Sequence, residues 1–388
     1  MSEPFWKYQS EIYDLGVSGV KPGLSTDATK LEVQARENMS PGAYWFVAGG
    51  AGTGATMRAN REAFYRWRIV PRMLRGATVR SLARTVLGTY MPAPVLVAPI
   101  GIQNVMHPDG ELATARAASS LGIPLVLSTT ASRSIEEVAA ACGDGPRWFQ
   151  LYWPNDEQLC LSMLRRAESA GFTTLVVTID CWSLGWRPND LDGAYPAFNL
   201  GVGSAIPFTD PVFLSQLDAP PTVDLVAAVK RWSEIFNDVD RTWQYVEFLR
   251  RHWGGPMVLK GIQHPDDALF AIDVGADGIV VSNHGGRQVD GAVGSLDVLP
   301  DIVRAVGDRL EVLFDSGIRS GSDIFKALAL GARAVLVGRP VAFGLGQGGE
   351  RGVRHVLRSL LADFDLTVGL SGYRNVDEIG PNALSRSA

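Results

Sequence analysis

From about residue 92 onward, eight short apolar runs alternate with segments of helical pattern. Each run is continuously apolar, as expected for strands buried on both faces of a parallel sheet. The runs begin at Pro94, Ile123, Arg147, Thr174, Pro256, Gly278, Val312 and Ala334. Helical patterns between them cover residues 110–121, 135–141, 158–170, 265–274, 295–306 and 322–330. Eight β–α units in succession predict an α/β fold, a (β/α)8 TIM barrel, over about residues 92–370.

One domain accounts for all 388 residues, because such barrels reach this length with insertions. Residues 1 to about 90 are predicted to be a helical lead-in. Its glycine-rich stretch at 48–54 has no strand before it, so it indicates a loop and not a dinucleotide-binding fingerprint. Residues 188–240 form a long insertion after the fourth strand, and a long loop at that place predicts a lid over the site.

Polar side chains stand where the apolar runs end. Active-site residues of a barrel lie at the carboxyl ends of its strands. The residues found there are Ser128, Gln150, Tyr152, Thr178, Asp180, Lys260, Ser282, His284, Asp315, Gly338 and Arg339. A random scatter of polar residues would not fall so regularly, so the sequence predicts one site at this end of the barrel.

The stretch 280–290 carries the strongest single motif, a buried run that ends in His284, two glycines and Arg287. Histidine can exchange a proton near neutral pH. Arginine offers a fixed cation and a fork of donors to an anionic group. A structural loop is the alternative for this stretch taken alone.

The last two strands are followed by Asp315–Gly321, which contains Arg319, and by Gly338 and Arg339. Glycines, an arginine and a helix N-terminus at these two strand ends predict a phosphate-binding cradle, with a pair of ordinary turns as the alternative. Lys260 would place an ammonium inside the barrel mouth. The whole set suits a phosphorylated planar cofactor with an anionic substrate over it.

Composition excludes several other classes of function. The net charge of −5 argues against nucleic-acid or polybasic membrane binding. The three cysteines have neither metal spacing nor an even count, so we expect free thiols, a cytoplasmic location and no metal. No signal peptide is apparent, and no apolar run reaches the roughly 18 residues of a membrane span.

The chain resembles the FMN-dependent 2-hydroxy acid oxidase and dehydrogenase family, and among its members it is most similar to lactate 2-monooxygenase. The resemblance runs nearly end to end, through several long motifs in fixed order. They include residues 71–74, 98–101, 149–154, 185–191, 209–213, 259–268, 282–288, 314–319 and 337–340.

The resemblance implies a catalytic role for four residues. His284 is the base that takes a proton from the substrate, and Asp180 orients it, as an Asp–His pair does elsewhere. Tyr152 hydrogen-bonds near the substrate oxygen. Lys260 lies by the flavin edge and stabilises the reduced ring.

The resemblance also implies the binding residues, and a homotetramer or larger homo-oligomer. Arg187 and Arg287 bind the substrate carboxylate. The residues implied to bind FMN are Pro99, Ile100, Gly101, Ser128, Gln150, Thr178, Lys260, Ser282, Asp315, Ser316, Gly317, Arg319, Gly338 and Arg339.

Two departures from the family pattern affect the substrate site. Phe46 stands where the family has a tyrosine that binds the carboxylate, and Thr130 stands where glycolate oxidase has a tryptophan. Both changes argue against lactate as the substrate. They favour a larger 2-hydroxy acid, or a 2-hydroxy ester, amide or lactone. A glycine at 101 hints away from a simple oxidase.

The electron acceptor stays open between oxygen, with or without decarboxylation of the product, and another acceptor. A different enzyme on the same barrel, such as an isomerase, is a competing hypothesis. A binding protein with a degenerate site is disfavoured by the intact His284, Asp180, Lys260 and Arg287.

Overall fold

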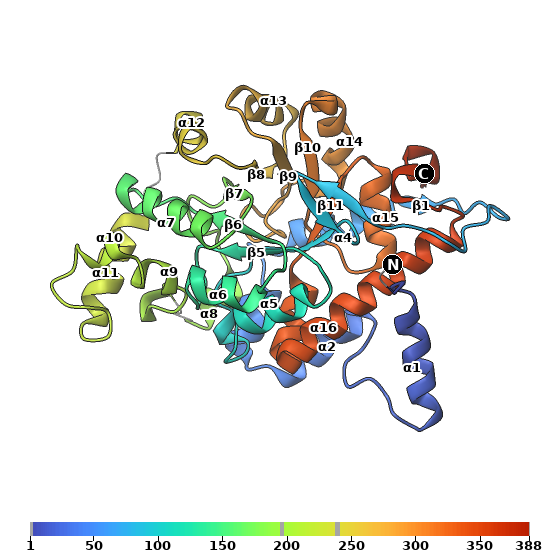
Figure 1. The fold of residues 1–388 in the computed structure, drawn as a ribbon, viewed down its shortest axis with the longest axis horizontal. Helices are drawn as coiled ribbons and strands as arrows, with labels where there is room; N and C mark the ends of the chain where they lie inside the picture. Colours follow the sequence, from blue (N-terminus) through green and yellow to red (C-terminus); the bar gives the residue numbers. More distant parts are fainter. Residues whose placement is uncertain (1–2, 195–197, 237–240, 388) are drawn as a thin grey trace.

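The computed structural model describes residues 3–194, 198–236 and 241–387. Its centre is a closed barrel of parallel strands, which confirms the predicted (β/α)8 fold (Figure 1). The strands are β4 (Val95–Val97), β5 (Leu125–Ser128), β6 (Arg147–Leu151), β7 (Leu175–Thr178), β8 (Met257–Ile262), β9 (Gly278–Val281), β10 (Glu311–Phe314) and β11 (Ala334–Val337). They follow one another around the barrel in chain order, and β11 closes it by pairing with β4, Leu336 opposite Leu96.

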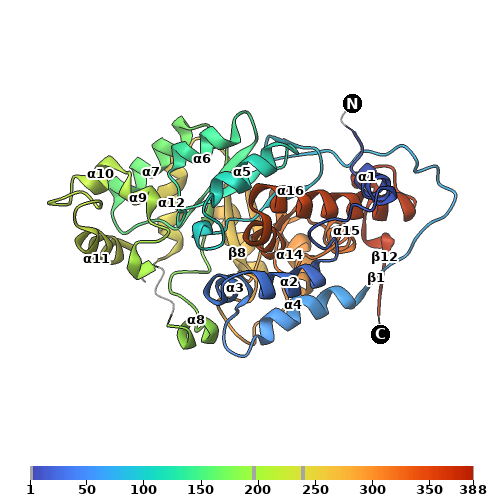
Figure 2. The same ribbon diagram turned by 90° about the horizontal axis from the view of Figure 1, so that it is seen from below.

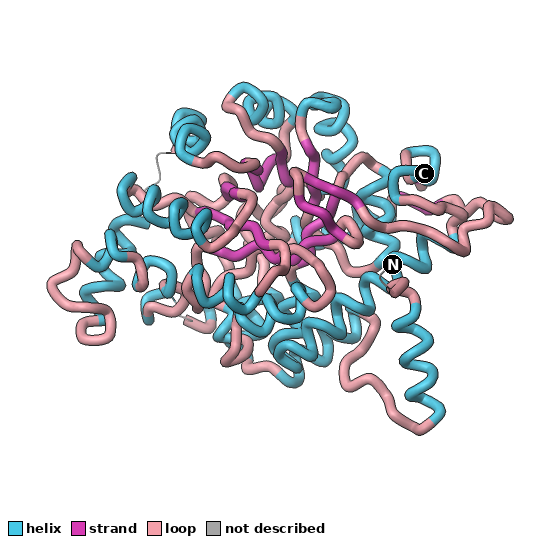
Figure 3. Tube along the Cα trace, viewed as in Figure 1, coloured by secondary structure: helices cyan, strands magenta, loops and turns pink. Residues whose placement is uncertain are grey.

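Helices surround the strands on the outside (Figure 3). They are α5 (Glu111–Ser119), α6 (Ile135–Cys142), α7 (Glu157–Ser169), α12 (Trp243–His252), α13 (Pro265–Asp273), α14 (Ser295–Val306), α15 (Gly321–Ala329) and α16 (Arg339–Leu370). The helix α16 is interrupted at Gly348 and Gly349, whose backbone angles are not helical. None of the helices in the described part of the chain combines the length and the apolar character that crossing a bilayer requires.

Both faces of the barrel strands are buried, which explains why the runs are continuously apolar. In β4, Leu96 joins the cluster inside the barrel, while Val95 and Val97 pack against the outer helices. In β6, Trp148 points inward and Phe149 outward. A strand with two apolar environments loses the alternation that one exposed face would impose.

A short antiparallel hairpin closes one end of the barrel, the end at which the barrel strands begin. Its strands are β2 (Arg84–Val86) and β3 (Thr89–Met91). Val86 and Met91 are fully buried in the interior cluster, and the indole Nε1 of Trp148 donates to Thr89 Oγ1 at 2.9 Å. With this end filled, the opposite mouth of the barrel is the place where a ligand can enter.

The first part of the lead-in is helical, and short strands follow it. It contains α1 (Lys7–Val17), α2 (Ala28–Asn38), α3 (Pro41–Ala48) and α4 (Ala55–Tyr65), followed by the strand β1 (Trp67–Ile69). The glycine-rich stretch at 48–54 is the turn between α3 and α4, which confirms that it is a loop. The strand β1 pairs antiparallel with β12 (Leu384–Arg386), and Figure 2 shows both strands at the same end of the molecule as α1.

The insertion contains several helices where the structure describes it, and its role as a lid stays a prediction. Its elements are α8 (Pro188–Asp192), η2 (Phe198–Leu200), α9 (Ala205–Phe208), α10 (Pro211–Leu214) and α11 (Leu225–Phe236). Asp210 is fully buried and forms an ion pair of 3.0 Å with Arg166 of α7, which anchors α9 and α10 to the barrel. Residues 195–197 and 237–240 of the predicted lid lie outside the described residues.

Candidate active site

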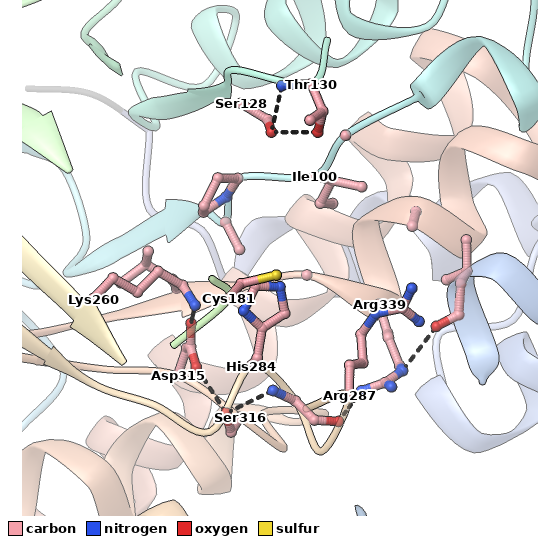
Figure 4. A pocket seen from close by; sticks show the side chains of 18 of the residues that line it. Ile100, Ser128, Thr130, Cys181, Lys260, His284, Arg287, Asp315, Ser316 and Arg339 are labelled. Atoms are coloured by element: carbon pink, nitrogen blue, oxygen red, sulfur yellow. Dashed lines mark hydrogen bonds and ion pairs between the residues drawn. The ribbon is translucent and has the colours of Figure 1, made fainter. Parts of the chain in front are cut away.

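A cavity opens at the carboxyl end of the barrel strands, opposite the hairpin (Figure 4). Most of the predicted site residues line it. They are Phe46, Pro99, Ile100, Gly101, Ser128, Thr130, Tyr152, Arg187, Lys260, His284, Arg287, Asp315, Ser316, Gly317, Arg319, Gly338 and Arg339. The other four lie directly behind this wall: Asp180 contacts His284, Ser282 contacts Lys260, Gln150 contacts Ser128, and Thr178 is the register partner of Lys260.

His284 follows β9 and is held by its neighbours in one orientation. Its backbone adopts φ = 58°, an unusual conformation for a residue with a side chain. Its backbone N–H donates to Ser282 Oγ at 3.1 Å, and its Nδ1 lies 2.8 Å from Asp180 Oδ1. The carboxylate holds the proton on Nδ1, so the lone pair of Nε2 faces the cavity, where Tyr152 OH lies 3.5 Å away.

The charges of this pair suit a proton acceptor. Burial lowers the pKa of His284 below its ordinary value, although Asp180 opposes that shift. Burial also disfavours the charged carboxylate of Asp180, but the nearby His284 and Lys260 outweigh it and lower its pKa. The site therefore holds a neutral imidazole beside a carboxylate, which is the state that can accept a proton.

Gly261 makes room for the carboxylate. It sits at a register shift in β8 between Lys260 and Ile262, with φ = 114°. A Cβ atom at this position would lie 2.6 Å from Cβ of Asp180. A larger residue would push Asp180 away from His284.

Lys260 is buried and yet charged. Its Nζ donates to Ser282 Oγ at 3.0 Å and lies 3.2 Å from Asp315 Oδ2. Burial disfavours the ammonium, but the carboxylates of Asp315 and Asp180 outweigh it and raise the pKa of Lys260. A fixed cation thus stands at the floor of the cavity.

Three arginines give the cavity an excess of positive charge. Arg287 donates to Gly49 O, Arg339 donates to the carbonyl oxygens of Val47, Gly49 and Gly285, and Arg187 donates to Arg287 O and Gln288 Oε1. Within the described residues, none of the three forms an ion pair with a carboxylate. Figure 4 shows Arg287 and Arg339 side by side.

Burial among other cations makes this arrangement unfavourable without an anion. Burial lowers the pKa of Arg287 well below its ordinary value, and repulsion from Arg187 and Arg339 lowers it further. Burial, with Arg319 nearby, lowers the pKa of Arg339 to about 9. Anionic groups bound here would relieve both effects, so the cavity is built for anions.

The polar groups on the wall also fit a phosphorylated planar cofactor. Among the described residues, the amide Nε2 of Gln150 and the hydroxyl of Thr178 are buried without a hydrogen-bond partner. A buried polar atom without a partner costs free energy, so both atoms call for a ligand. Arg319 and Arg339 mark the end of the cavity where α16 begins, and Gly338 precedes that helix without a capping side chain. Free N–H groups and cations together suit a phosphate.

Nine lining residues were not predicted from the sequence: Val47, Ala98, Cys181, Leu184, Phe236, Gly285, Ile318, Leu336 and Ala342. Cys181 follows Asp180; it is half-buried and lines the cavity, and burial raises its pKa. Leu184 and Phe236 come from opposite ends of the segment between β7 and α12. Only the folded chain brings them together, and no spacing signals it.

Comparisons with known proteins agree with this geometry. The model of the FMN-dependent dehydrogenase family matches residues 35–386. The FMN-dependent alpha-hydroxy acid dehydrogenase qulF of Penicillium citrinum is 50% identical over 386 residues, covering 98% of this chain and 96% of the relative. The 4-hydroxymandelate oxidase of Amycolatopsis orientalis is 43% identical, covering 89% and 94%. A crystal structure of mandelate oxidase superimposes with a TM-score of 0.82 at 41% identity, covering 94% of this chain and 98% of that chain.

Proposed function

The chain belongs to the family of FMN-dependent α-hydroxy acid dehydrogenases and oxidases, and from this membership we propose that it oxidises an (S)-2-hydroxy acid with His284 as the base. The observation that carries the proposal is the Asp180–His284 pair, which faces a cavity with two arginines that lack a carboxylate partner among the described residues. The resemblance to lactate 2-monooxygenase in particular stays a prediction.

The cofactor is FMN. Gln150, Thr178, Ser128 and residues 99–101 would hold its ring system, while Arg319 and Arg339 would hold its phosphate. When bound, FMN supplies the acceptor for the two electrons that leave the substrate. Lys260 is placed to stabilise negative charge on the ring, since its ammonium stays protonated despite burial.

The side chains of the site have different roles in binding and oxidising the substrate. Arg187 and Arg287 bind the carboxylate and so fix the position of carbon 2. The Nε2 atom of His284 takes a proton from the substrate, and Asp180 stabilises the imidazolium that results. Tyr152, 3.5 Å from Nε2, donates its hydroxyl hydrogen to the substrate oxygen. The product is the 2-oxo acid, or its decarboxylated derivative.

The preferred substrate carries a substituent larger than methyl. Phe46 places an apolar ring 5.5 Å from the guanidinium carbon of Arg287, where the family pattern has a hydroxyl. Thr130 leaves room where glycolate oxidase has a bulky ring. An ester, amide or lactone is the second candidate, and the absence of a tyrosine hydroxyl favours it, since such compounds lack a full carboxylate.

Anaerobic mixing of the yellow holoenzyme with a substrate panel tests the function. Bleaching of the flavin by (S)-mandelate or another (S)-2-hydroxy acid is expected. Bleaching by the methyl esters alone would favour the second candidate. No bleaching by any member would overturn the function and favour a non-redox reaction, such as isomerisation, on the same barrel.

The remaining proposals concern the surroundings of the enzyme. We propose that oxygen or another acceptor re-oxidises the flavin, and that the chain forms a homotetramer or larger homo-oligomer in the cytoplasm. Cys142, Cys160 and Cys181 are free thiols, as expected in a reducing compartment. Light scattering tests the assembly, and re-oxidation by oxygen or a dye after anaerobic bleaching tests the acceptor.

A further inference from the structure

A second cavity lies beside the catalytic cavity, between the ends of β6 and β7 and the start of α12. Tyr152, Cys181, Leu184 and Phe236 line both cavities. The two spaces are thus adjoining chambers that meet at these four side chains. Neither Arg187 nor Arg287 lines the second chamber, so a carboxylate and the group that enters this chamber would bind at different places.

The wall of the second chamber is largely aromatic. Trp153 and Trp243 line it, together with the buried Val246. Trp153 stacks on Tyr245 with ring centroids 6.4 Å apart, and the Arg241 guanidinium lies 5.2 Å from the Trp153 ring. The stacked groups hold the wall in one conformation, which lowers the entropy cost of binding a flat ligand.

The rim of this chamber is apolar and exposed. Trp182 is 61% exposed and Leu184 is 60% exposed, and both line the chamber. Large apolar side chains so exposed beside a cavity gain free energy when an apolar group covers them. Arg241 also lines the chamber, with its guanidinium over the Trp153 and Tyr245 rings, and the apolar and aromatic side chains of the rest of the wall favour an aromatic group.

We propose that this second chamber binds an aromatic ring at the far end of the substrate. The carboxylate is held by the two arginines, carbon 2 lies at His284, and the substituent passes Tyr152 and Leu184 into the chamber. The preferred substrate is then a 2-hydroxy acid whose ring is joined through a short chain, longer than the direct attachment in mandelate. The inference rests on the proposed function, because it assumes that the catalytic cavity binds the acid end.

Two pairs of compounds that differ only by a phenyl group test the chamber. Binding of 2-oxobutanoate and of 2-oxo-4-phenylbutanoate to the oxidised holoenzyme is measured by the change in flavin absorbance, which needs no turnover. The phenyl compound should bind at least ten-fold more tightly, since a buried ring is a large apolar contribution. The matching 2-hydroxy acids are then compared in anaerobic flavin reduction.

Filling variants show where the phenyl group binds. Ser183 and Thr242 line the chamber from two sides and do not line the catalytic cavity. Ser183→Phe and Thr242→Phe should each reduce the ten-fold preference to about two-fold or less. Ser183→Ala and Thr242→Ala add no volume and should keep it. Two independent sites protect the test against one variant that fails to fold, which circular dichroism detects.

Different results would contradict the ring site and the proposed function. A preference below ten-fold in the natural protein, or a preference that survives both filling variants, would overturn the second chamber as the ring site. Failure of both 2-hydroxy acids to bleach the flavin would instead overturn the proposed function, while the oxo-acid ratio still reports on the chamber.

Discussion

Gly101 lies against Thr130 so closely that a Cβ atom on Gly101 would stand 2.1 Å from Thr130 Oγ1 and 3.1 Å from its Cβ. Positions 101 and 130 are therefore coupled, because the residue at one limits the size of the residue at the other. Thr130 in turn hydrogen-bonds to Ser128 Oγ at 3.1 Å, on the wall assigned to the cofactor.

Gly101→Ala should lower the melting temperature of the holoenzyme, because overpacking typically costs about 1–3 kcal/mol. The double variant Gly101→Ala/Thr130→Ala removes the clashing hydroxyl and should recover at least half of the loss. Gly16→Ala adds the same methyl group where no heavy atom lies within 4 Å, so it is the control. Equal melting temperatures for the single and double variants would disprove the coupling.

His284→Gln should retain FMN but slow anaerobic flavin reduction by about 10²–10⁴-fold, the usual contribution of a general base. Stopped-flow absorbance measures the rate. His264→Gln replaces an exposed histidine that does not line the cavity, and that variant should reduce at the natural rate. Unchanged reduction in His284→Gln would show that another group accepts the proton.

The pH dependence of kcat/KM should follow the neutral form of His284. Burial lowers its pKa, so the imidazole stays unprotonated down to a pH below the ordinary value near 6.5. The rate should be flat above that folded pKa and fall ten-fold per pH unit below it. In Asp180→Asn, which removes the charge that raises the pKa, the midpoint should move to lower pH and the plateau should fall. A midpoint above 6.5 in the natural protein would contradict this assignment.

Phe46→Tyr should strengthen the binding of small acids such as lactate. A hydroxyl beside Arg287 adds a hydrogen bond to a charged group, worth about 1.5–3 kcal/mol, or roughly 10- to 150-fold in affinity. Titration with the product analogue pyruvate measures it, and Phe46→Leu is the control without a hydroxyl. No gain for Phe46→Tyr, or an equal gain for Phe46→Leu, would mean that this ring does not face the carboxylate.

Asp210→Asn should loosen the insertion while leaving the barrel folded. It removes the charge paired with Arg166 but keeps an acceptor for the backbone N–H of Val212. Loss of one partner from a buried pair costs up to about 3 kcal/mol here, since Arg166 keeps Glu136 as a second partner. Limited proteolysis should cut residues 198–236 faster than in Asp218→Asn, an exposed change in the same insertion. Equal cutting rates would contradict the anchoring role.

The barrel could be predicted because its strands are buried on both sides, so their composition alone marks them. Leu96 and Val97 face different environments, yet both must be apolar. The shortest helices of the insertion, α9 and α10, gave no such signal, because four residues are too few for a periodic pattern. The helix α10 begins at Pro211, and the carboxylate of Asp210 before it accepts from the backbone N–H of Val212.

The site was predictable where chemistry and strand ends coincide, as at His284 and Lys260. Leu184 and Phe236 were missed because an apolar residue in a long insertion has no spacing that points to a cavity. The aromatic chamber was missed for the same reason, since Trp153 and Trp243 come together only when α12 packs beside β6.

The pairing of β11 with β4 has a consequence for synthesis on the ribosome. The first strand of the barrel keeps an open edge until Ala334–Val337, the last strand of the barrel in chain order, has emerged. Arg319 and Arg339 emerge equally late, so a nascent chain has no complete phosphate site. FMN can find a complete phosphate site only after these residues have emerged, and the exposed edge before that point is the stage at which aggregation competes with folding.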